Sequence, residues 1–226
     1  MIKSGIDQDA IVKMFTQATA RQGEMLRKAV SDAMLKALQG RELTLTNVRS
    51  VLKAMTEAAS KGAAGSALPD VDVEALLTKA TAGMDAALLQ TVQAHRKALQ
   101  QFVDQGVGVQ DKQMKGALAN IEKMEDMFFS TVAKAAADAD AALQGPWEQV
   151  LSAMKMKGTD TGAQARLSLE QLTAQAQTAM REGRAASLRS AQAMMDSYAA
   201  LVSGVLIGMS DSLQQATGAA QKARKK

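Results

Sequence analysis

Residues 73–102 read VEALLTKATAGMDAALLQTVQAHRKALQQF, and this stretch decides the fold class. Its apolar side chains recur at intervals of three and four residues, the spacing that places them on one face of an α-helix. It contains no proline and no run of β-branched residues, so nothing in it favours a strand. We expect this helix to begin at an N-cap residue, Asp70, and to end at about residue 105.

The same periodicity extends over most of the chain. It predicts further helices over about residues 6–39, 45–61, 110–143, 147–156 and 163–220. The last of these is long enough that we expect a break near Gly183 or near Ser203 and Gly204. Long helices joined by short loops favour an all-α fold, an elongated bundle of about four long antiparallel amphipathic helices plus shorter helices.

Glycine and proline mark the expected turns. Gly145 and Pro146 are expected to end the helix over residues 110–143. The segment GTDTG at residues 158–162 is expected to form a turn, and Thr161 with Gln164 has the spacing of a capping box for the helix that follows.

The segment KGAAGSALP at residues 61–69 has the composition of a linker, with two glycines and Pro69. It divides the chain into two expected domains. Residues 1–68 form an N-terminal helical hairpin, and residues 69–226 form the main helical bundle with a basic C-terminal tail.

The charge of the chain is concentrated at its end. The sequence has 27 basic and 23 acidic residues, and four of the basic ones are Lys222, Arg224, Lys225 and Lys226. Without these four, basic and acidic residues are equal in number, so the tail is the candidate site for an anionic partner. A neutral body argues against nucleic acid as the main partner. The chain has no cysteine and no apolar segment typical of a signal peptide, so we expect a cytoplasmic protein, peripheral to a granule or membrane if it binds one.

No motif of catalysis is complete. His95 is the only histidine, and it lies on the apolar stripe of its helix, where a core role is expected. Gly106 and Gly108 begin a dinucleotide fingerprint that has no third glycine and no preceding strand. The acidic cluster of Glu122, Glu125 and Asp126 is interleaved with a lysine, as on a solvated face. We expect no enzymatic activity, no metal site and no cofactor.

Trp147, the only tryptophan, is expected to cap one end of the bundle. The most apolar window, YAALVSGVLIGM at residues 198–209, is too short to cross a bilayer core, which needs about 20 residues. It is either a buried helix segment or an interaction patch. The candidate patch residues are Tyr198, Leu201, Val202, Gly204, Val205, Ile207 and Gly208. An apolar segment followed by a basic cluster is typical of a helix that lies at a membrane interface.

Long Ala- and Gln-rich helices, the absence of cysteine, and a register such as LTAQAQTA at residues 172–179 resemble the phasins. Phasins are bacterial proteins that coat polyhydroxyalkanoate storage granules. The segments GTDTG at residues 158–162 and LVSGVL at residues 201–206 are similar to an uncharacterised helical family of proteobacteria grouped with the phasins. Neither resemblance assigns a role to an individual residue.

These features lead to one expected function and three alternatives. The expected function is a non-enzymatic coat or adaptor at an apolar surface, either a storage granule or a membrane face. The first alternative is a soluble homo-oligomeric scaffold whose apolar stripes stay buried, and self-association is expected in any case. The others are a weak nucleic-acid binder that uses the tail, and a toxin component that inserts residues 198–209.

Overall fold

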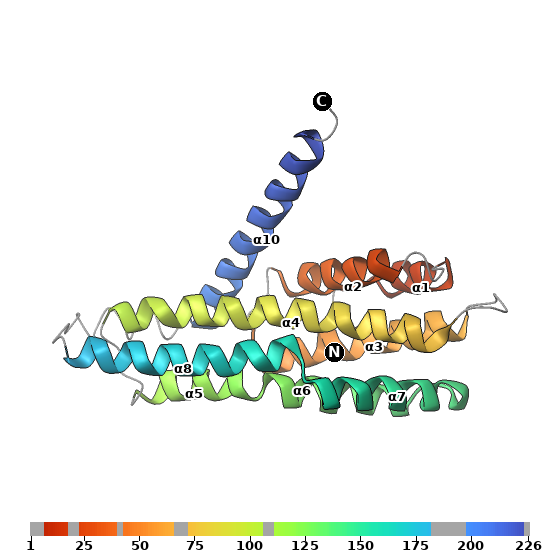
Figure 1. Cartoon of the computed structure of the whole chain (residues 1–226), viewed down its shortest axis with the longest axis horizontal. Helices are drawn as coiled ribbons and strands as arrows, with labels where there is room; N and C mark the ends of the chain where they lie inside the picture. The colour runs from red at the N-terminus through yellow and green to blue at the C-terminus, as the bar shows by residue number, and fades with distance from the viewer. Residues whose placement is uncertain are drawn as a thin grey trace.

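A computed structural model describes residues 7–17, 23–39, 43–65, 72–105, 111–181 and 198–223. Every regular element in these ranges is an α-helix, and none of the described residues lies in a β-strand. The predicted all-α fold class is therefore confirmed. The helices form an elongated bundle, from which a C-terminal helix projects (Figure 1). In chain order they are α1 (Gln8–Gln17), α2 (Gly23–Leu38), α3 (Leu45–Ala64), α4 (Val73–Asp104), α5 (Lys112–Glu122), α6 (Met124–Ala137), α7 (Ala141–Lys157), α8 (Asp160–Arg181) and α10 (Tyr198–Ala223).

Helix α4 is the central element of the bundle. It contacts α2, α8, α10 and α7, and its apolar stripe is fully buried, as in Leu77, Met84 and Leu99. Its N-cap is Asp72, whose carboxylate accepts a hydrogen bond of 2.9 Å from the backbone N–H of Ala75. The N-cap expected at Asp70 is therefore wrong, and Asp70 itself lies outside the described residues.

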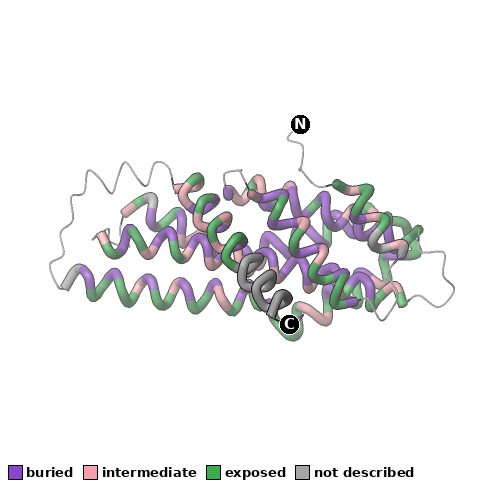
Figure 2. The backbone as a smooth tube through the Cα atoms, turned by 90° about the horizontal axis from the view of Figure 1, so that it is seen from above, coloured by how far each residue is buried: buried purple, intermediate pink, exposed green. Residues whose placement is uncertain are grey.

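Two lines of helices run antiparallel along the bundle (Figure 1). Helices α5 and α6 follow one another with a single interruption at Lys123, whose backbone stays in the helical region. Helices α7 and α8 return along them, α7 beside α6 and α8 beside α5. Seen from above, buried residues alternate with exposed ones along each helix, so each apolar stripe faces the interior (Figure 2).

The helix expected over residues 110–143 ends earlier than predicted. Helix α6 ends at Ala137, and α7 begins at Ala141, so Gly145 and Pro146 lie inside α7 rather than between helices. Glycine has no Cβ to clash with the following proline ring, which lets Gly145 stay helical. Pro146 lacks the N–H that would bond the carbonyl of Ala142, but Ala142 is exposed, so water can serve this carbonyl instead.

Two other expected helices are each divided. The stretch 6–39 forms α1 and α2, which pack on different partners, α1 on α3 and α2 on α4. The stretch 163–220 contains the end of α8 at Arg181 and the start of α10 at Tyr198. Gly183, one expected break, lies outside the described residues, whereas Ser203 and Gly204, the other, lie within continuous α10.

The described helices share one core across the expected boundary at residues 68 and 69. Helix α2 packs along α4, and α3 packs along α6. At the α2–α4 crossing, a Cβ added to Gly83 would lie 2.5 Å from the carbonyl oxygen of Arg27 and 2.9 Å from the Cβ of Val30. Helix α3 also continues through Gly62 to Ala64, into the expected linker. The division into two domains remains a prediction. Limited proteolysis at the expected linker tests it, because the α2–α4 and α3–α6 contacts would hold the two parts together after a cut.

Candidate functional site

The apolar window lies in the first turns of α10, where this helix crosses α4 (Figure 1). Val202 and Leu206 are fully buried, and Ser203 and Ser210 are nearly so. Four neighbouring side chains are half-buried against the same core: Tyr198, Leu201, Val205 and Met209. Val202, one of the predicted patch residues, is therefore part of the core, and the apolar face of this segment is turned toward the bundle.

A polar contact joins the start of α10 to α4. A hydrogen bond of 2.7 Å connects Nδ1 of His95 and the hydroxyl of Tyr198, and the Tyr198 ring lies 6.2 Å from the ring of Phe102. His95 is 2% exposed, and its burial lowers the pKa of the imidazole to about 4. The same desolvation raises the pKa of the Tyr198 hydroxyl. Both groups are thus neutral at physiological pH, and their hydrogen bond joins α10 to α4, in keeping with the core role expected for His95.

The outward face of the same turns carries glycine at two positions, Gly204 and Gly208, and we call it the bare face. Gly204 and Gly208, one helical turn apart, are exposed, and a Cβ added to either would meet no atom of the described residues within 4 Å. Packing against the described part of the chain therefore does not require glycine at either position. Ile207 is half-buried, between the two faces.

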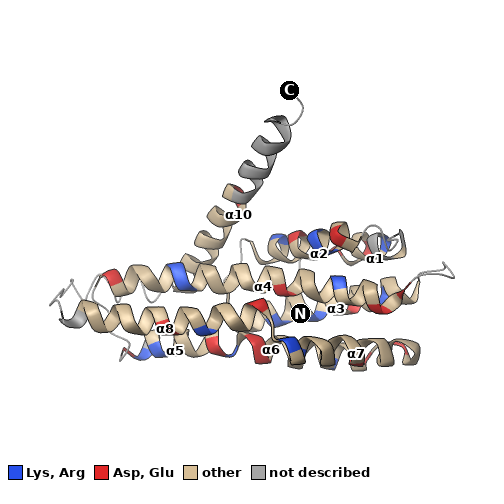
Figure 3. Cartoon of the chain, in the orientation of Figure 1, with Lys and Arg blue, Asp and Glu red and all other residues tan. Residues whose placement is uncertain are grey.

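The basic tail is only partly described. Lys222 belongs to α10, but its side chain is not described, and Arg224, Lys225 and Lys226 lie outside the described residues. The first turns of α10 carry no charged residue, whereas basic and acidic residues are interspersed over the bundle (Figure 3). In the sequence of the C-terminal segment, the apolar residues thus lie at its start, over residues 198–209, and the basic residues lie at its end, from Lys222 onward.

A second organised site, which the sequence did not predict, holds the N-terminus of α8. The carboxylate of Asp85 accepts hydrogen bonds from the backbone N–H groups of Asp160 (3.0 Å) and Thr161 (3.2 Å). The carboxylate of Glu125 accepts from the backbone N–H and the hydroxyl of Thr159, at 3.2 and 2.6 Å. The free N–H groups of a helix start are thereby satisfied by side chains from two other helices.

The N-cap of α8 is Thr159, whose hydroxyl oxygen accepts from the backbone N–H of Gly162 at 2.9 Å. The capping box expected from Thr161 and Gln164 is therefore wrong. Thr161 instead donates its hydroxyl to the backbone carbonyl of Asp85 at 3.0 Å, and Gln164 donates to Ser168.

The two carboxylates at this site, those of Asp85 and Glu125, are closely surrounded by other groups. Burial raises the pKa of Asp85, although its hydrogen bonds from Thr161 and Asp160 act in the opposite direction. A Cβ added to Gly162 would lie 2.1 Å from the Glu125 carboxylate, so a larger residue at this position would displace that carboxylate from its present place. Glu125 is thus a half-buried capping residue, which corrects the solvated face expected for it, whereas Glu122 and Asp126 are exposed as expected.

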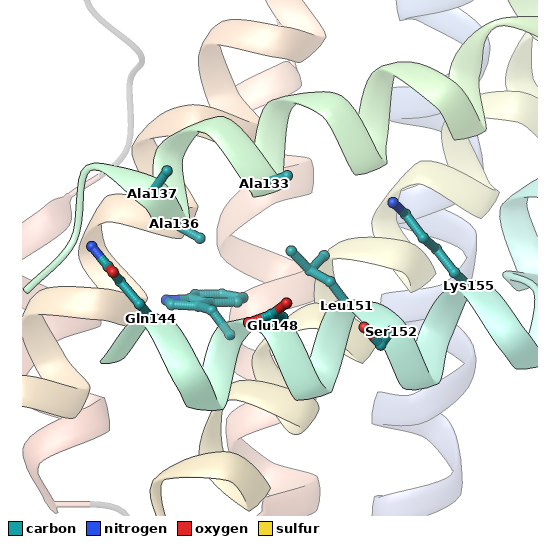
Figure 4. Close-up of a pocket in the computed structure, with 9 residues that line it drawn as sticks. Ala133, Ala136, Ala137, Gln144, Glu148, Leu151, Ser152 and Lys155 are labelled. Carbon is teal, nitrogen blue, oxygen red and sulfur yellow. The ribbon is translucent and has the colours of Figure 1, made fainter. Parts of the chain in front are cut away.

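Trp147 is buried, and its Nε1–H donates to the hydroxyl oxygen of Ser60 at 3.0 Å. It therefore joins α7 to α3, and its expected role as a cap over one end of the bundle remains a prediction. An open groove of about 400 Å³ lies beside it between α6 and α7 (Figure 4). The groove has small side chains, Ala133, Ala136 and Ala137, on its α6 side, and mixed ones on its α7 side.

The described residues contain no group of three or more histidine, cysteine, aspartate or glutamate side chains placed to hold a metal ion. Gly106 and Gly108 lie outside the described ranges. Among the described helices, none has the length and apolar character needed to cross a membrane.

Comparison with known proteins places the chain in a family. Residues 1–215 match the "Family of unknown function (DUF6781)", and the chain belongs to this family. A search of curated proteins and a search of solved structures found no significant match. The resemblance to an uncharacterised helical family agrees with this result, whereas the resemblance to phasins remains a hypothesis.

Proposed function

We propose that this protein is a non-enzymatic coat or adaptor that binds an apolar, anionic surface through α10 and the basic tail. The observation that carries the proposal is the course of α10, which packs on α4 through its first turns and then extends away from the bundle to Ala223 (Figure 1). Helices in proteins owe most of their stability to tertiary packing. The outer half of α10 is expected to obtain such packing from a partner.

The chemistry of the C-terminal segment favours a lipid-like surface as this partner. Beyond Met209, the sequence places Leu213, Ala216 and Ala220 at helical spacing, and Lys222 and the last three residues follow. Apolar residues bind the hydrocarbon boundary, while basic residues are attracted to anionic headgroups, each by about 1 kcal/mol. The surface of a storage granule and the face of a membrane both offer this combination.

One observation favours a second candidate, the homo-oligomeric scaffold. The apolar stripes of the bundle are buried in the core, so the bundle itself offers little apolar surface. Among the described residues, the large exposed hydrophobic side chains are Met25, Met156 and Leu167. Gly204 and Gly208 would allow another helix to approach closely. In this candidate, α10 of a second copy covers the bare face. The tail as a weak nucleic-acid site is the remaining alternative.

The experiment is co-sedimentation of the full chain with vesicles that contain anionic lipid, with neutral vesicles as reference. A variant carrying glutamine at positions 222, 224, 225 and 226 is expected to lose most of the binding and its salt dependence. The matched control carries glutamine at four exposed lysines of the bundle, Lys13, Lys28, Lys97 and Lys157. Equal loss in both variants, or binding only to nucleic acid, would contradict the proposal. Mass determination in solution with Gly204→Leu and Gly208→Leu tests the scaffold.

A further inference from the structure

A groove between α3 and α6 gathers basic side chains and hydroxyl groups. It has a volume of about 330 Å³. Helix α3 contributes Arg49 and Lys53, one turn apart, and α6 contributes Ser130, Thr131 and Lys134. One carboxylate, Asp138, also lines it, so positive charge is in excess. This site is separate from α10, and nothing in the proposed function depends on it.

Among the described residues, one of the three basic side chains of the groove forms an ion pair. Lys53 lies 3.7 Å from Glu57 in an ion pair whose side chains are 59% and 37% exposed, and such pairs contribute little. Arg49 and Lys134 form no ion pair with any described residue. Three cationic groups from two neighbouring helices thus face one groove without a matching set of carboxylates.

Thr131 supplies an independent sign of a missing ligand. It is 8% exposed, and its hydroxyl is buried with no hydrogen-bond partner among the described residues. Other buried threonines donate to the carbonyl four residues earlier, Thr56 to Leu52 at 2.9 Å and Thr91 to Ala87 at 3.0 Å. A buried hydroxyl without a partner costs free energy, which a ligand in the groove would recover.

We propose that the α3–α6 groove binds a phosphate group. The Arg49 guanidinium offers paired donors that match phosphate oxygens, and Lys134 and Lys53 add positive charge. The Thr131 hydroxyl, which has no partner among the described residues, donates to one of the remaining oxygens. The Ser130 hydroxyl donates to another once it rotates away from the carbonyl of Met127, to which it now donates its single proton at 3.1 Å. The phosphate belongs either to a small soluble molecule or to a phospholipid headgroup, because both present the same oxygens.

Calorimetric titration of the full chain with inorganic phosphate at constant ionic strength tests the site. We expect saturable binding that weakens about tenfold or more in Arg49→Gln and Lys134→Gln, since hydrogen bonds to charged groups are the strong ones. Lys97→Gln removes an exposed lysine of α4 and is the matched control, with unchanged affinity expected. Thr131→Val should raise the melting temperature without phosphate but reduce the further rise that phosphate produces.

A second arm identifies the source of the phosphate. Vesicles of phosphatidylcholine with and without phosphatidic acid are mixed with a chain whose four tail positions are already glutamine, so that the tail does not contribute. Loss of phosphatidic acid binding in Arg49→Gln on this background assigns the site to a headgroup, whereas binding of free phosphate alone assigns it to a soluble ligand. The proposal is overturned if neither ligand binds, if Lys97→Gln weakens binding as much as Arg49→Gln does, or if Thr131→Val leaves the phosphate response unchanged.

Discussion

Asp85 and Thr161 bind each other twice, although 76 positions separate them in the sequence. The Asp85 carboxylate accepts from the backbone N–H of Thr161, and the Thr161 hydroxyl donates to the backbone carbonyl of Asp85. This reciprocal pair fixes the start of α8 against the middle of α4. From this fixed start, α8 packs along α4 and α5. The pair thereby sets the position of α8 in the bundle.

Removal of the Asp85 carboxylate should therefore be costly. Asp85→Ala leaves the buried N–H group of Thr161 and the partly buried N–H group of Asp160 without acceptors, and we expect the free energy of unfolding to fall by about 2 kcal/mol. Urea unfolding followed by circular dichroism measures the loss. The control is Asp32→Ala, which removes an exposed carboxylate from α2 and should change stability little. A similar small effect at both positions would refute the role of the cap.

Gly83 and Gly116 should respond in opposite directions to the same substitution. Gly83→Ala forces α2 away from α4, because the new Cβ would lie 2.5 Å from the Arg27 carbonyl oxygen, and we expect a loss of about 2 kcal/mol or more. Gly116 lies in the exposed interior of α5 with no atom within 4 Å of an added Cβ, so Gly116→Ala should gain up to about 1 kcal/mol. The melting temperatures of the two variants test this prediction. A Gly83→Ala variant more stable than the wild type would show that α2 is not held against α4.

The buried histidine predicts a pH dependence of stability with a definite sign. Burial lowers the folded-state pKa of His95 to about 4, below its usual value of 6.5, so the unfolded chain takes up the proton first as the pH falls. Stability that is fully present above pH 6.5 is then lost progressively down to about pH 4, in total by about 3 kcal/mol. We expect this part of the loss to be absent in His95→Gln when unfolding free energies are compared from pH 4 to 7.5. Parallel curves for the two proteins would place His95 outside the core.

The two faces of α10 should tolerate a charge very differently. Val202→Asp puts an unpaired carboxylate into the α4 contact and should cost several kcal/mol, as buried charges do. Gly208→Asp puts the same carboxylate on the bare face, and we expect the melting temperature to stay within a few degrees. If both variants melt alike, α10 does not pack on α4 in the way described.

The sequence predicted the elements whose signals are local. The start of α3 and the end of α4 agree with the expected ranges because periodic apolar residues extend along each helix. The start of α4 was placed two residues too early, since Asp72 rather than Asp70 is its N-cap. The end of α6 and the start of α7 were misplaced because Gly145 and Pro146 were expected to stop a helix, whereas the glycine avoids the clash that a side chain before proline would cause.

Sites formed by residues far apart in the sequence could not be predicted from local sequence patterns. Nothing in the spacing around Asp85 or Glu125 indicates that these carboxylates cap a helix that begins at residue 160. The only local signal was the segment GTDTG, whose glycine at position 162 leaves space for the Glu125 carboxylate. The burial of Val202 was likewise not settled by the sequence, because an apolar window of this length fits both a core helix and a patch, although its length favours the core helix.

The central claim is that the outer half of α10 contacts the bound surface, and site-specific fluorescence tests it most directly. Because the chain has no cysteine, Ala216→Cys and Met156→Cys each carry a single environment-sensitive label, the first on outer α10 and the second at an 84% exposed position of the bundle. On addition of vesicles that contain anionic lipid, the account predicts a blue shift and a gain in intensity at position 216 and no change at position 156. No change at position 216, or the same change at both positions, would contradict it.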